Sequence, residues 1–491
     1  MDCRRRRRSP TPVILSTSDA IVDKMTDIPM RDEGLPQIEG PPRDLQMTPE
    51  QKKLNIKGKI YFNLFVVSMG FLLLFIAYQS LQILQSSINA VGGLGTTSLA
   101  TTYVALVVSC MFLPSYMIQR LGLKYTMAAS MVMYLTYFLA NMKPMWITLL
   151  PASFILGMGG APLWTAKCSY VSFMAQKYAD LEDLKDATPI VTGFFGLFFM
   201  VFQTSQVWGN LISYMILRPS NNSATVSPSF TEFCGASFHP TRDLFFEQTL
   251  LSHAAEDKRF MLAALYSCIV VFAIALLLLF LDPTAREVRI ANPPIQILVE
   301  SVGQMGNLNQ LLLIPVTVYS GLQQAFIWSD YTQAFISCSW GVPYVGFVMV
   351  WYGVADSLGS VTFGFMVKIV GRIPLMLMAA LMNSAAMIAM LKWHPTPTES
   401  HNYFVIAIIW GIADSSWQTQ LNALYGVLFS RRRNAAFSNY RLWESMGFIV
   451  MFSVQSTLRL YVKIVVLMTM LVVATIGYLV VEYRENGFLE I

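Results

Sequence analysis

LGMGGAPLWTAKCSY, at residues 156–170, and WGIADSSWQTQLNALY, at residues 410–425, are two versions of one pattern. Each is an apolar segment with a glycine at its second position, followed by tryptophan and polar side chains, so that Gly157 corresponds to Gly411. Internal repeats of this kind indicate a chain built from two related halves, as in many membrane transporters, whose solute sites lie where the repeats meet.

Two short turns repeat at a similar offset. IQRLGLKY at 118–125 and VKIVGRIP at 367–374 both place glycine and basic residues after an apolar segment. The alternative is chance similarity among glycine-rich apolar segments. Spacing and turn chemistry agree in both halves, however, so we favour a true repeat.

The composition excludes most soluble classes. Of the 491 residues, 55% are hydrophobic and 13% are charged, whereas soluble domains carry about 25% charged residues. The net charge of +5 is too small to indicate binding to nucleic acid, and the six cysteines form no CxxC pair that would suggest a zinc or redox scaffold. The partner that the composition does predict is the lipid bilayer.

The apolar residues after residue 59 fall into twelve segments. A spanning helix needs about 20 apolar residues at 1.5 Å of rise per residue. We therefore expect an all-α membrane protein with twelve transmembrane helices in two pseudo-repeated six-helix bundles. The expected spans are residues 60–84, 98–118, 125–141, 146–168, 190–216, 260–281, 310–333, 343–366, 373–391, 403–429, 437–458 and 461–482.

The remaining segments complete the expected organisation. Residues 1–59 have no apolar run and are rich in proline and charge, which predicts a disordered cytoplasmic tail. The other expected parts are an N-terminal six-helix bundle at 60–281, a cytoplasmic linker at 282–309, a C-terminal bundle at 310–482 and a cytoplasmic tail at 483–491.

Basic residues concentrate in alternate loops, which predicts the orientation. Lys57 and Lys59 precede the first expected span, and Arg431–Arg433 lie between the tenth and eleventh, whereas loop 85–97 has neither Lys nor Arg. Basic short loops face the cytoplasm. Both termini are therefore expected on the cytoplasmic side.

The long loop after the fifth span is then external. It carries the sequon Asn221-Asn222-Ser223, so we expect Asn221 either to be glycosylated or to be an unused chance sequon. Cys234 and Cys338 are the two cysteines on the outer side, where they either form a disulfide or remain two free thiols.

The turn after the second span resembles a degraded G-x-x-x-D-x-x-G-R-[RK] motif of the major facilitator superfamily. Here it reads PSYMIQRLGLK at 114–124, and Ile118 stands near the place of the usual aspartate. Longer strings resemble the Unc-93-like family, particularly its A-type members, over about residues 60–482. They are GFLLLFIAYQSLQILQSSI at 70–88, PLWTAKCSYV at 162–171, FFGLFFMVFQTSQVWGNLIS at 194–213, YSGLQQAFIWSDYT at 319–332, WQTQLNALYGVLF at 417–429 and NYRLWESMGF at 439–448.

The resemblance implies the twelve-span major facilitator fold. Some members of the family resemble regulatory subunits of two-pore-domain potassium channels, and a different branch escorts Toll-like receptors from the endoplasmic reticulum. The present sequence resembles the plasma-membrane, A-type branch more closely. The resemblance also implies that spans 1, 4, 7 and 10 line a central cavity.

Those four spans carry many polar and aromatic residues. Amides and aromatic faces suit a small polar or cationic solute, but they equally suit hydrogen bonds that hold the helices together. The central-cavity candidates are Tyr78, Gln79, Gln82, Trp164, Gln323, Gln324, Trp328, Asp414, Trp417 and Gln418.

Charged side chains within the spans are expensive in lipid and therefore informative. Asp356 and Asp414 lie near mid-span and are the candidates for coupling to protons or cations, or else halves of ion pairs. We expect Asp330 to reach water at the outer end and Lys167 to snorkel at the inner end. Arg441 and Glu444, three residues apart, are expected to form a local pair.

Two functions fit these features. The sequence has no nucleophile–base pair, metal-ligand spacing or phosphate loop, so we expect neither an enzyme nor a cofactor or metal. We favour a regulatory subunit that modulates a potassium channel and ion balance, because of the resemblance and the degraded motif. The alternative is a secondary transporter that moves a small polar or cationic solute by rocking its halves.

Overall fold

The computed structural model describes residues 48–184, 188–218, 233–239, 254–283, 303, 306–429 and 433–486. The sequon at Asn221 and most of the expected linker 282–309 lie outside these residues. Contacts divide the chain into two units, residues 1–52 and 53–491. Of the first unit, only residues 48–52 are described.

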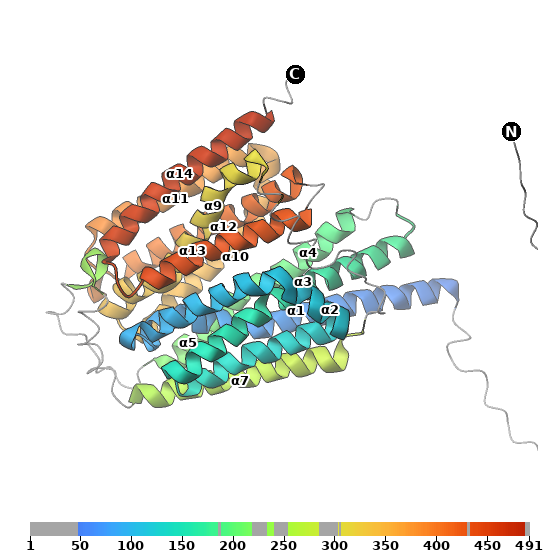
Figure 1. The fold of residues 1–491 in the computed structure, drawn as a ribbon, viewed down its shortest axis with the longest axis horizontal. Coiled ribbons are helices and arrows are strands. Elements are labelled where there is room, and N and C mark those ends of the chain that lie inside the picture. Colours follow the sequence, from blue (N-terminus) through green and yellow to red (C-terminus); the bar gives the residue numbers. More distant parts are fainter. Residues whose placement is uncertain are drawn as a thin grey trace, which may run out of the picture. The chain divides into compact units, whose positions relative to one another are not determined.

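The described residues are helical throughout, with short connections (Figure 1). Figure 1 shows the earlier helices, blue to yellow-green, gathered in one bundle and the later helices, yellow to red, in a second. The first bundle contains α1 (Pro49–Ile88), η2 (Val91–Gly93), α2 (Leu94–Met142), α3 (Trp146–Leu181), α4 (Thr188–Gln203), α5 (Ser205–Leu217) and α7 (Ala254–Phe280).

The second bundle begins at α9 (Leu308–Ala325), which continues directly into the π-helix η5 (Phe326–Ser337). The short segment η4 (Gly235–Ser237) also contacts this bundle, through α11, α14 and η5. The other helices are α10 (Val342–Val370), α11 (Arg372–Lys392), η6 (Pro397–Glu399), α12 (Ser400–Leu428), α13 (Arg433–Val454) and α14 (Leu460–Asn486).

The predicted all-α fold with twelve spans is confirmed. Every expected segment coincides with a helix: α2 contains the second and third, α4 and α5 form the fifth, and α9 with η5 forms the seventh. By length and composition alone, eight helical stretches among the described residues qualify as membrane spans. The others are shorter, less apolar or interrupted.

The backbone reproduces the repeat seen in the sequence. Gly122 ends the second span with φ 77° and ψ 172°, and Gly371 ends the eighth with φ 85° and ψ 172°. L-residues with a side chain rarely adopt such positive φ values, so glycine is required at both turns. The matching dihedrals support two homologous halves.

Glycines also bring helices together at matching places. A Cβ on Gly157 of α3 would overlap the carbonyl oxygen of Thr102 on α2, and a Cβ on Gly411 of α12 would lie 2.6 Å from that of Tyr352 on α10. Small residues allow such close backbone approach in membranes, where helix association depends on packing. The two crossings therefore occupy equivalent positions in the two bundles.

The bundles meet along two equivalent helix pairs. α2 packs against α13, and α5 packs against α10. Since α2 corresponds to α10 and α5 to α13 in the repeat, each half contributes the same two elements. We call the interface between the two bundles the seam. In the expected facilitator arrangement, the helices that line it are α1, α3, α9 with η5, and α12.

The first helix begins earlier than the sequence analysis predicted. Residues 49–59 were expected in the disordered tail, but α1 starts at Pro49. The Thr48 hydroxyl accepts from the Gln51 amide N–H, and the Gln51 side chain accepts from the Thr48 N–H. This capping box, with proline at the first helical position, fixes the start of the helix in polar sequence.

We predict that Gly157→Ala destabilises the protein, because its methyl group would overlap the α2 backbone. Overpacking of this kind costs about 1–3 kcal/mol. Thermal unfolding of the purified protein should show a lower midpoint. The matched control is Gly364→Ala in α10, where a Cβ meets nothing within 4 Å. Equal midpoints for the two variants would contradict the close crossing.

Candidate functional site

Asp414 is the centre of a buried polar cluster in the C-terminal bundle. Its Oδ1 accepts from Gln323 Nε2 at 2.5 Å and from Gln324 Nε2 at 3.3 Å, and its Oδ2 accepts from Tyr352 OH at 2.5 Å. The indole of Trp410 donates to Gln323 Oε1 at 2.6 Å, which fixes the amide orientation. Three donors from α9 and α10 thus stabilise a carboxylate with 3% exposure.

Asp356 lies one helical turn after Tyr352 on the same face of α10. Its side chain is only 5% exposed, and its Oδ1 has no hydrogen-bond partner. The Gly411 crossing brings α12 against this part of α10, because a Cβ on Gly411 would lie 3.3 Å from Asp356 N. The two mid-span acids therefore share one helix crossing.

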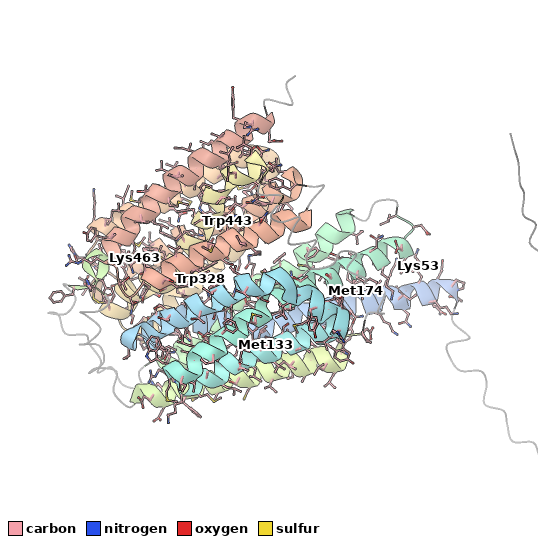
Figure 2. All side chains as sticks on the ribbon, viewed as in Figure 1. Lys53, Met133, Met174, Trp328, Trp443 and Lys463 are labelled. Atoms are coloured by element: carbon pink, nitrogen blue, oxygen red, sulfur yellow. A yellow bond between two sulfur atoms is a disulfide. The ribbon has the colours of Figure 1, made fainter. Side chains whose placement is uncertain are left out.

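Gln82 connects to an aromatic bridge across the seam. Gln82 Nε2 donates to Tyr103 OH at 2.9 Å, and the Tyr103 ring stacks on Phe448 of α13 at 4.3 Å. Phe448 in turn stacks on Trp328 of η5 at 5.6 Å. Figure 2 places Trp328 within the C-terminal bundle. Stacked side chains therefore join the N-terminal bundle to η5.

The other candidates in α1 and α3 face the N-terminal bundle. Gln79 Oε1 accepts from Ser205 of α5 at 2.5 Å. Tyr78 packs edge-on against Tyr134, and Trp164 packs edge-on against Phe75. The structure therefore groups Tyr78, Gln79 and Trp164 apart from the Asp414 cluster.

Gln418 belongs to a second cluster in the C-terminal bundle, which is centred on the Glu444 carboxylate of α13. Glu444 Oε1 accepts from Gln418 at 3.4 Å and from Tyr440 at 3.1 Å, and Arg441 donates to its Oε2 at 2.6 Å. The expected pairing of Arg441 with Glu444 is thus present. Trp417 is separate, because its indole donates to Asn383 of α11 at 2.8 Å.

The expectation that Asp330 reaches water is wrong. Its carboxylate is 2% exposed and forms an ion pair with Lys463 of α14, whose side chain is also 2% exposed. Lys463 additionally donates to the Gln455 carbonyl oxygen at 3.0 Å. Lys463, labelled in Figure 2, is a lone cation inside the twelfth span, a signal that the sequence analysis overlooked.

Lys167 does not snorkel to water either. It is 1% exposed, and its ammonium lies 4.3–5.3 Å from the ring centroids of four aromatic residues. Cation–π attraction compensates part of the cost of desolvating the ammonium. The rings belong to Trp164, Phe195, Phe198 and Phe199.

Segment 233–239 is fastened to the C-terminal bundle. Cys234 and Cys338 form a disulfide that closes a separation of 104 residues, with Cα atoms 5.7 Å apart. The Leu460 N–H donates to the Phe238 carbonyl oxygen at 3.3 Å. A Cβ on Gly235, whose φ is 81°, would lie 2.7 Å from Pro395. Part of the loop that follows α5 is thus held against α11, η5 and α14.

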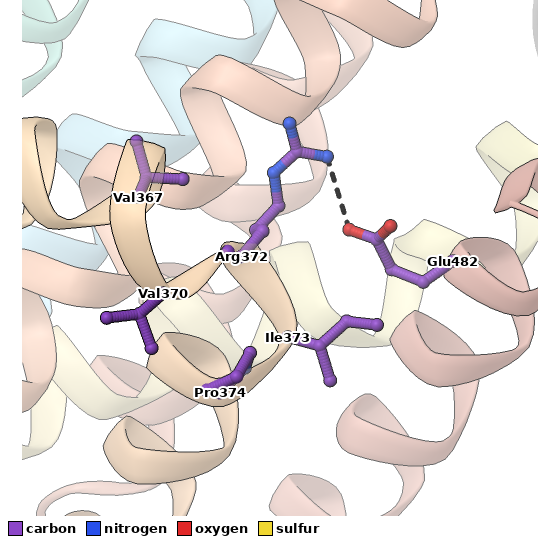
Figure 3. Close-up of a pocket in the computed structure, with 7 residues that line it drawn as sticks. Val367, Val370, Arg372, Ile373, Pro374 and Glu482 are labelled. Carbon is purple, nitrogen blue, oxygen red and sulfur yellow. Dashed lines mark hydrogen bonds and ion pairs between the residues drawn. The ribbon is translucent and has the colours of Figure 1, made fainter.

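An open pocket of about 440 Å³ lies away from these clusters, where α10 turns into α11 (Figure 3). Its polar contact is the ion pair between Arg372 and Glu482 at 3.2 Å, and Val367, Val370 and Ile373 contribute apolar walls. The pocket includes none of the predicted cavity residues. We therefore place the candidate functional site at Asp414 and Asp356.

The Asp414 site can hold charge and protons, but the described residues form no metal-binding group. Among them, no three His, Cys, Asp or Glu side chains come together in a way that could hold a metal ion. Tyr352 was not among the predicted site residues, although its spacing of four residues from Asp356 places both on one helical face. No comparable spacing in the sequence indicated that Trp410 or Tyr103 would contact the predicted residues.

We predict that Asp330→Asn strongly destabilises the protein, because it leaves the Lys463 ammonium buried without its counter-charge. Breaking a buried pair in this way costs about 3–5 kcal/mol. Adding Lys463→Met should recover much of the loss, as measured by thermal unfolding of single and double variants.

The control is Glu182→Gln, at an ion pair with Lys57 in which both side chains are partly exposed. The hydrogen bond from Lys57 holds the pKa of Glu182 below its usual value, but solvent screens this pair. Its loss should barely change the unfolding midpoint. If Asp330→Asn were as mild as this control, the buried ion pair would be contradicted.

The fold has clear counterparts among solved transporters. A nucleoside transporter, NupG, aligns with a TM-score of 0.59 and 12% identity over 85% of this chain and 98% of its own. A D-xylose-proton symporter aligns with a TM-score of 0.57 and 14% identity over 86% of this chain and 97% of its own. The chain therefore has the major facilitator fold; identities this low carry no information about substrate.

Sequence comparisons identify the family. Residues 85–479 match the family model described as "Ion channel regulatory protein UNC-93". "Protein unc-93 homolog A" of Xenopus laevis is 42% identical over 86% of this chain and 93% of its own length, and that of Homo sapiens is 37% identical over the same shares. A Caenorhabditis elegans protein, "Putative potassium channel regulatory protein unc-93", is 32% identical over 90% of this chain and 64% of its own. With a family model that covers residues 85–479 and these unc-93 homolog A relatives, the chain belongs to the UNC-93 family, and it has the major facilitator fold.

Proposed function

We propose that this protein is a regulatory subunit that modulates a potassium channel in the plasma membrane and thereby affects ion balance. The family description and the printed name of the nematode relative support this proposal. The protein would act by non-covalent contact with the channel subunit within the bilayer, without catalysis or a cofactor.

The structural observation that carries the proposal is the packing of the seam. The Tyr103 ring of the N-terminal bundle stacks directly on Phe448 of the C-terminal bundle, and Phe448 stacks on Trp328. Ile118, which is buried, stands near the place of the aspartate in the gating motif. Aromatic stacking between the bundles and an apolar side chain at the gating motif favour a regulatory subunit with a fixed conformation over a transporter that alternates between two conformations.

A specific observation also favours the second candidate, a secondary transporter of a small polar or cationic solute. Asp356 and Asp414 are buried acids at one helix crossing, in a fold shared with a nucleoside transporter and a sugar–proton symporter. In this candidate, the acids couple solute movement to protons or cations. The amides and aromatic rings of the predicted cavity residues bind the solute.

Two assays separate the candidates. As a regulator, the protein should alter the potassium current when co-expressed with a channel, and the purified protein in liposomes should give no saturable solute uptake. Stoichiometric co-purification of a channel from native membranes would identify the partner. Robust solute flux from the purified protein, without an effect on current, would overturn the regulatory proposal in favour of transport.

For the transporter, we predict that Asp414→Asn lowers uptake at least tenfold, since the amide cannot carry the coupling charge. The matched control is Asp183→Asn, in the exposed turn after α3. Unchanged uptake in the combined Asp356→Asn and Asp414→Asn variant would remove the coupling role from both acids.

The proposed topology places both termini in the cytoplasm and Asn221 outside. We predict that glycosidase treatment of protein from cells increases its gel mobility, and that Asn221→Gln abolishes this shift. An epitope at the N-terminus should be stained in intact cells only after permeabilisation. Staining without permeabilisation would contradict the topology.

A further inference from the structure

Three buried polar atoms on η5, α9 and α10 of the C-terminal bundle have no hydrogen-bond partner. They are Asp356 Oδ1, Tyr319 OH and Trp328 Nε1, on side chains that are 5%, 0% and 9% exposed. The Gly411 crossing brings Asp356 against α12 one turn before Asp414, and the Tyr319 ring packs edge-on against Trp417 one turn after Asp414. Buried polar groups almost always find partners, so this cluster requires an explanation.

The two acids of the cluster have opposite surroundings. Asp414 accepts hydrogen bonds from Gln323, Gln324 and Tyr352. Asp356, one turn from Tyr352, accepts none from any described residue. Hydrogen bonds donated to a carboxylate stabilise its charged form, whereas burial without donors favours the neutral acid. The structure therefore stabilises a negative charge at Asp414 and not at Asp356.

We infer that Asp356 and Asp414 together hold one exchangeable proton, which resides on Asp356, while Asp414 remains the carboxylate. Two carboxylates buried at one helix crossing would repel each other, and one shared proton removes that repulsion. The proton converts Asp356 into a neutral acid with an O–H donor. This inference holds for a regulator and a transporter alike.

The other charged groups described nearby do not neutralise the charge of Asp356 or Asp414. On α13, Glu444 is paired with Arg441, and on η5, Asp330 is paired with Lys463. On α9, Tyr319 is a neutral phenol at ordinary pH. From α5, the polar residue against α10 at Gly353 is the uncharged Gln206. No described cation forms an ion pair with Asp356 or Asp414.

Loss of the proton would leave two carboxylates at the Gly411 crossing. Their repulsion would loosen the contact between α10 and α12, which are adjacent in the C-terminal bundle. Because α10 also packs against α5 of the other bundle, a change at this crossing reaches the seam. Rising pH therefore favours separation at α10, and falling pH favours the closed arrangement.

Infrared difference spectroscopy of the purified full-length protein tests the proton directly. A protonated carboxyl group gives a carbonyl stretching band that carboxylates lack. Wild type at neutral pH should show this band, and isotopic labelling of aspartate carboxyl carbons should shift it. Asp356→Asn should abolish it, whereas Asp414→Asn and the control Glu444→Gln should retain it.

Two results would overturn the inference. One is a wild-type protein without any label-sensitive carboxylic acid band. The other is a band that persists in Asp356→Asn and disappears in Asp414→Asn. Should Asp356→Asn not fold, Asp356→Glu keeps the test decisive, because the band must then lose its sensitivity to aspartate labelling while remaining present.

Discussion

Charged side chains within the hydrocarbon region are stabilised by polar partners, most of them on other helices, and these contacts connect the helices of the C-terminal bundle. Asp414 of α12 draws donors from α9 and α10, and Asp330 of η5 pairs with Lys463 of α14. Glu444 of α13 accepts hydrogen bonds from Gln418 of α12 and from Arg441 of its own helix. Each contact between two helices fixes one of them against the other. Such contacts matter because lipid is as apolar as the side chains, so hydrophobic attraction between helices is weak. The polar core is therefore structural first, and any function that it has must use groups that already hold the bundle together.

Glycine allows the close approach of helices that the polar contacts require. At Gly157 and Gly411 the crossing helices approach to backbone contact, and the acids of α10 and α12 meet at the second crossing. The N-terminal bundle has the same crossing but lacks the acids. Its most deeply buried charge among the described residues is Lys167, which is 1% exposed and surrounded by aromatic rings. The two halves thus share a backbone plan and differ in chemistry. This difference confines the candidate site to the C-terminal bundle.

Local features of the fold were predictable from the sequence because they depend on local pattern. Apolar run length gave the spans, and the glycine turns at Gly122 and Gly371 revealed the repeat. Contacts between distant residues were not predictable. The sequence indicates that Asp330 is costly in lipid, but nothing local identifies Lys463, 133 residues away, as its partner. Lys167 was expected to extend to water because the aromatic residues of α4 that surround it lie in another span. The early start of α1 could have been found, since Thr48-Pro49-Glu50-Gln51 is a capping-box sequence.

Two homologous bundles thus face each other across a closed seam, where α1 meets η5. Ser86 Oγ and Thr332 Oγ1 lie 3.4 Å apart across it, close enough for a disulfide between cysteines at these positions. The most direct test is oxidative cross-linking in native membranes of Ser86→Cys combined with Thr332→Cys. We expect rapid cross-linking of this pair and little cross-linking of Ser87→Cys with Thr332→Cys, because adjacent helical residues point in different directions. Equal cross-linking of the two pairs, or no cross-linking of either, would contradict a closed seam between α1 and η5.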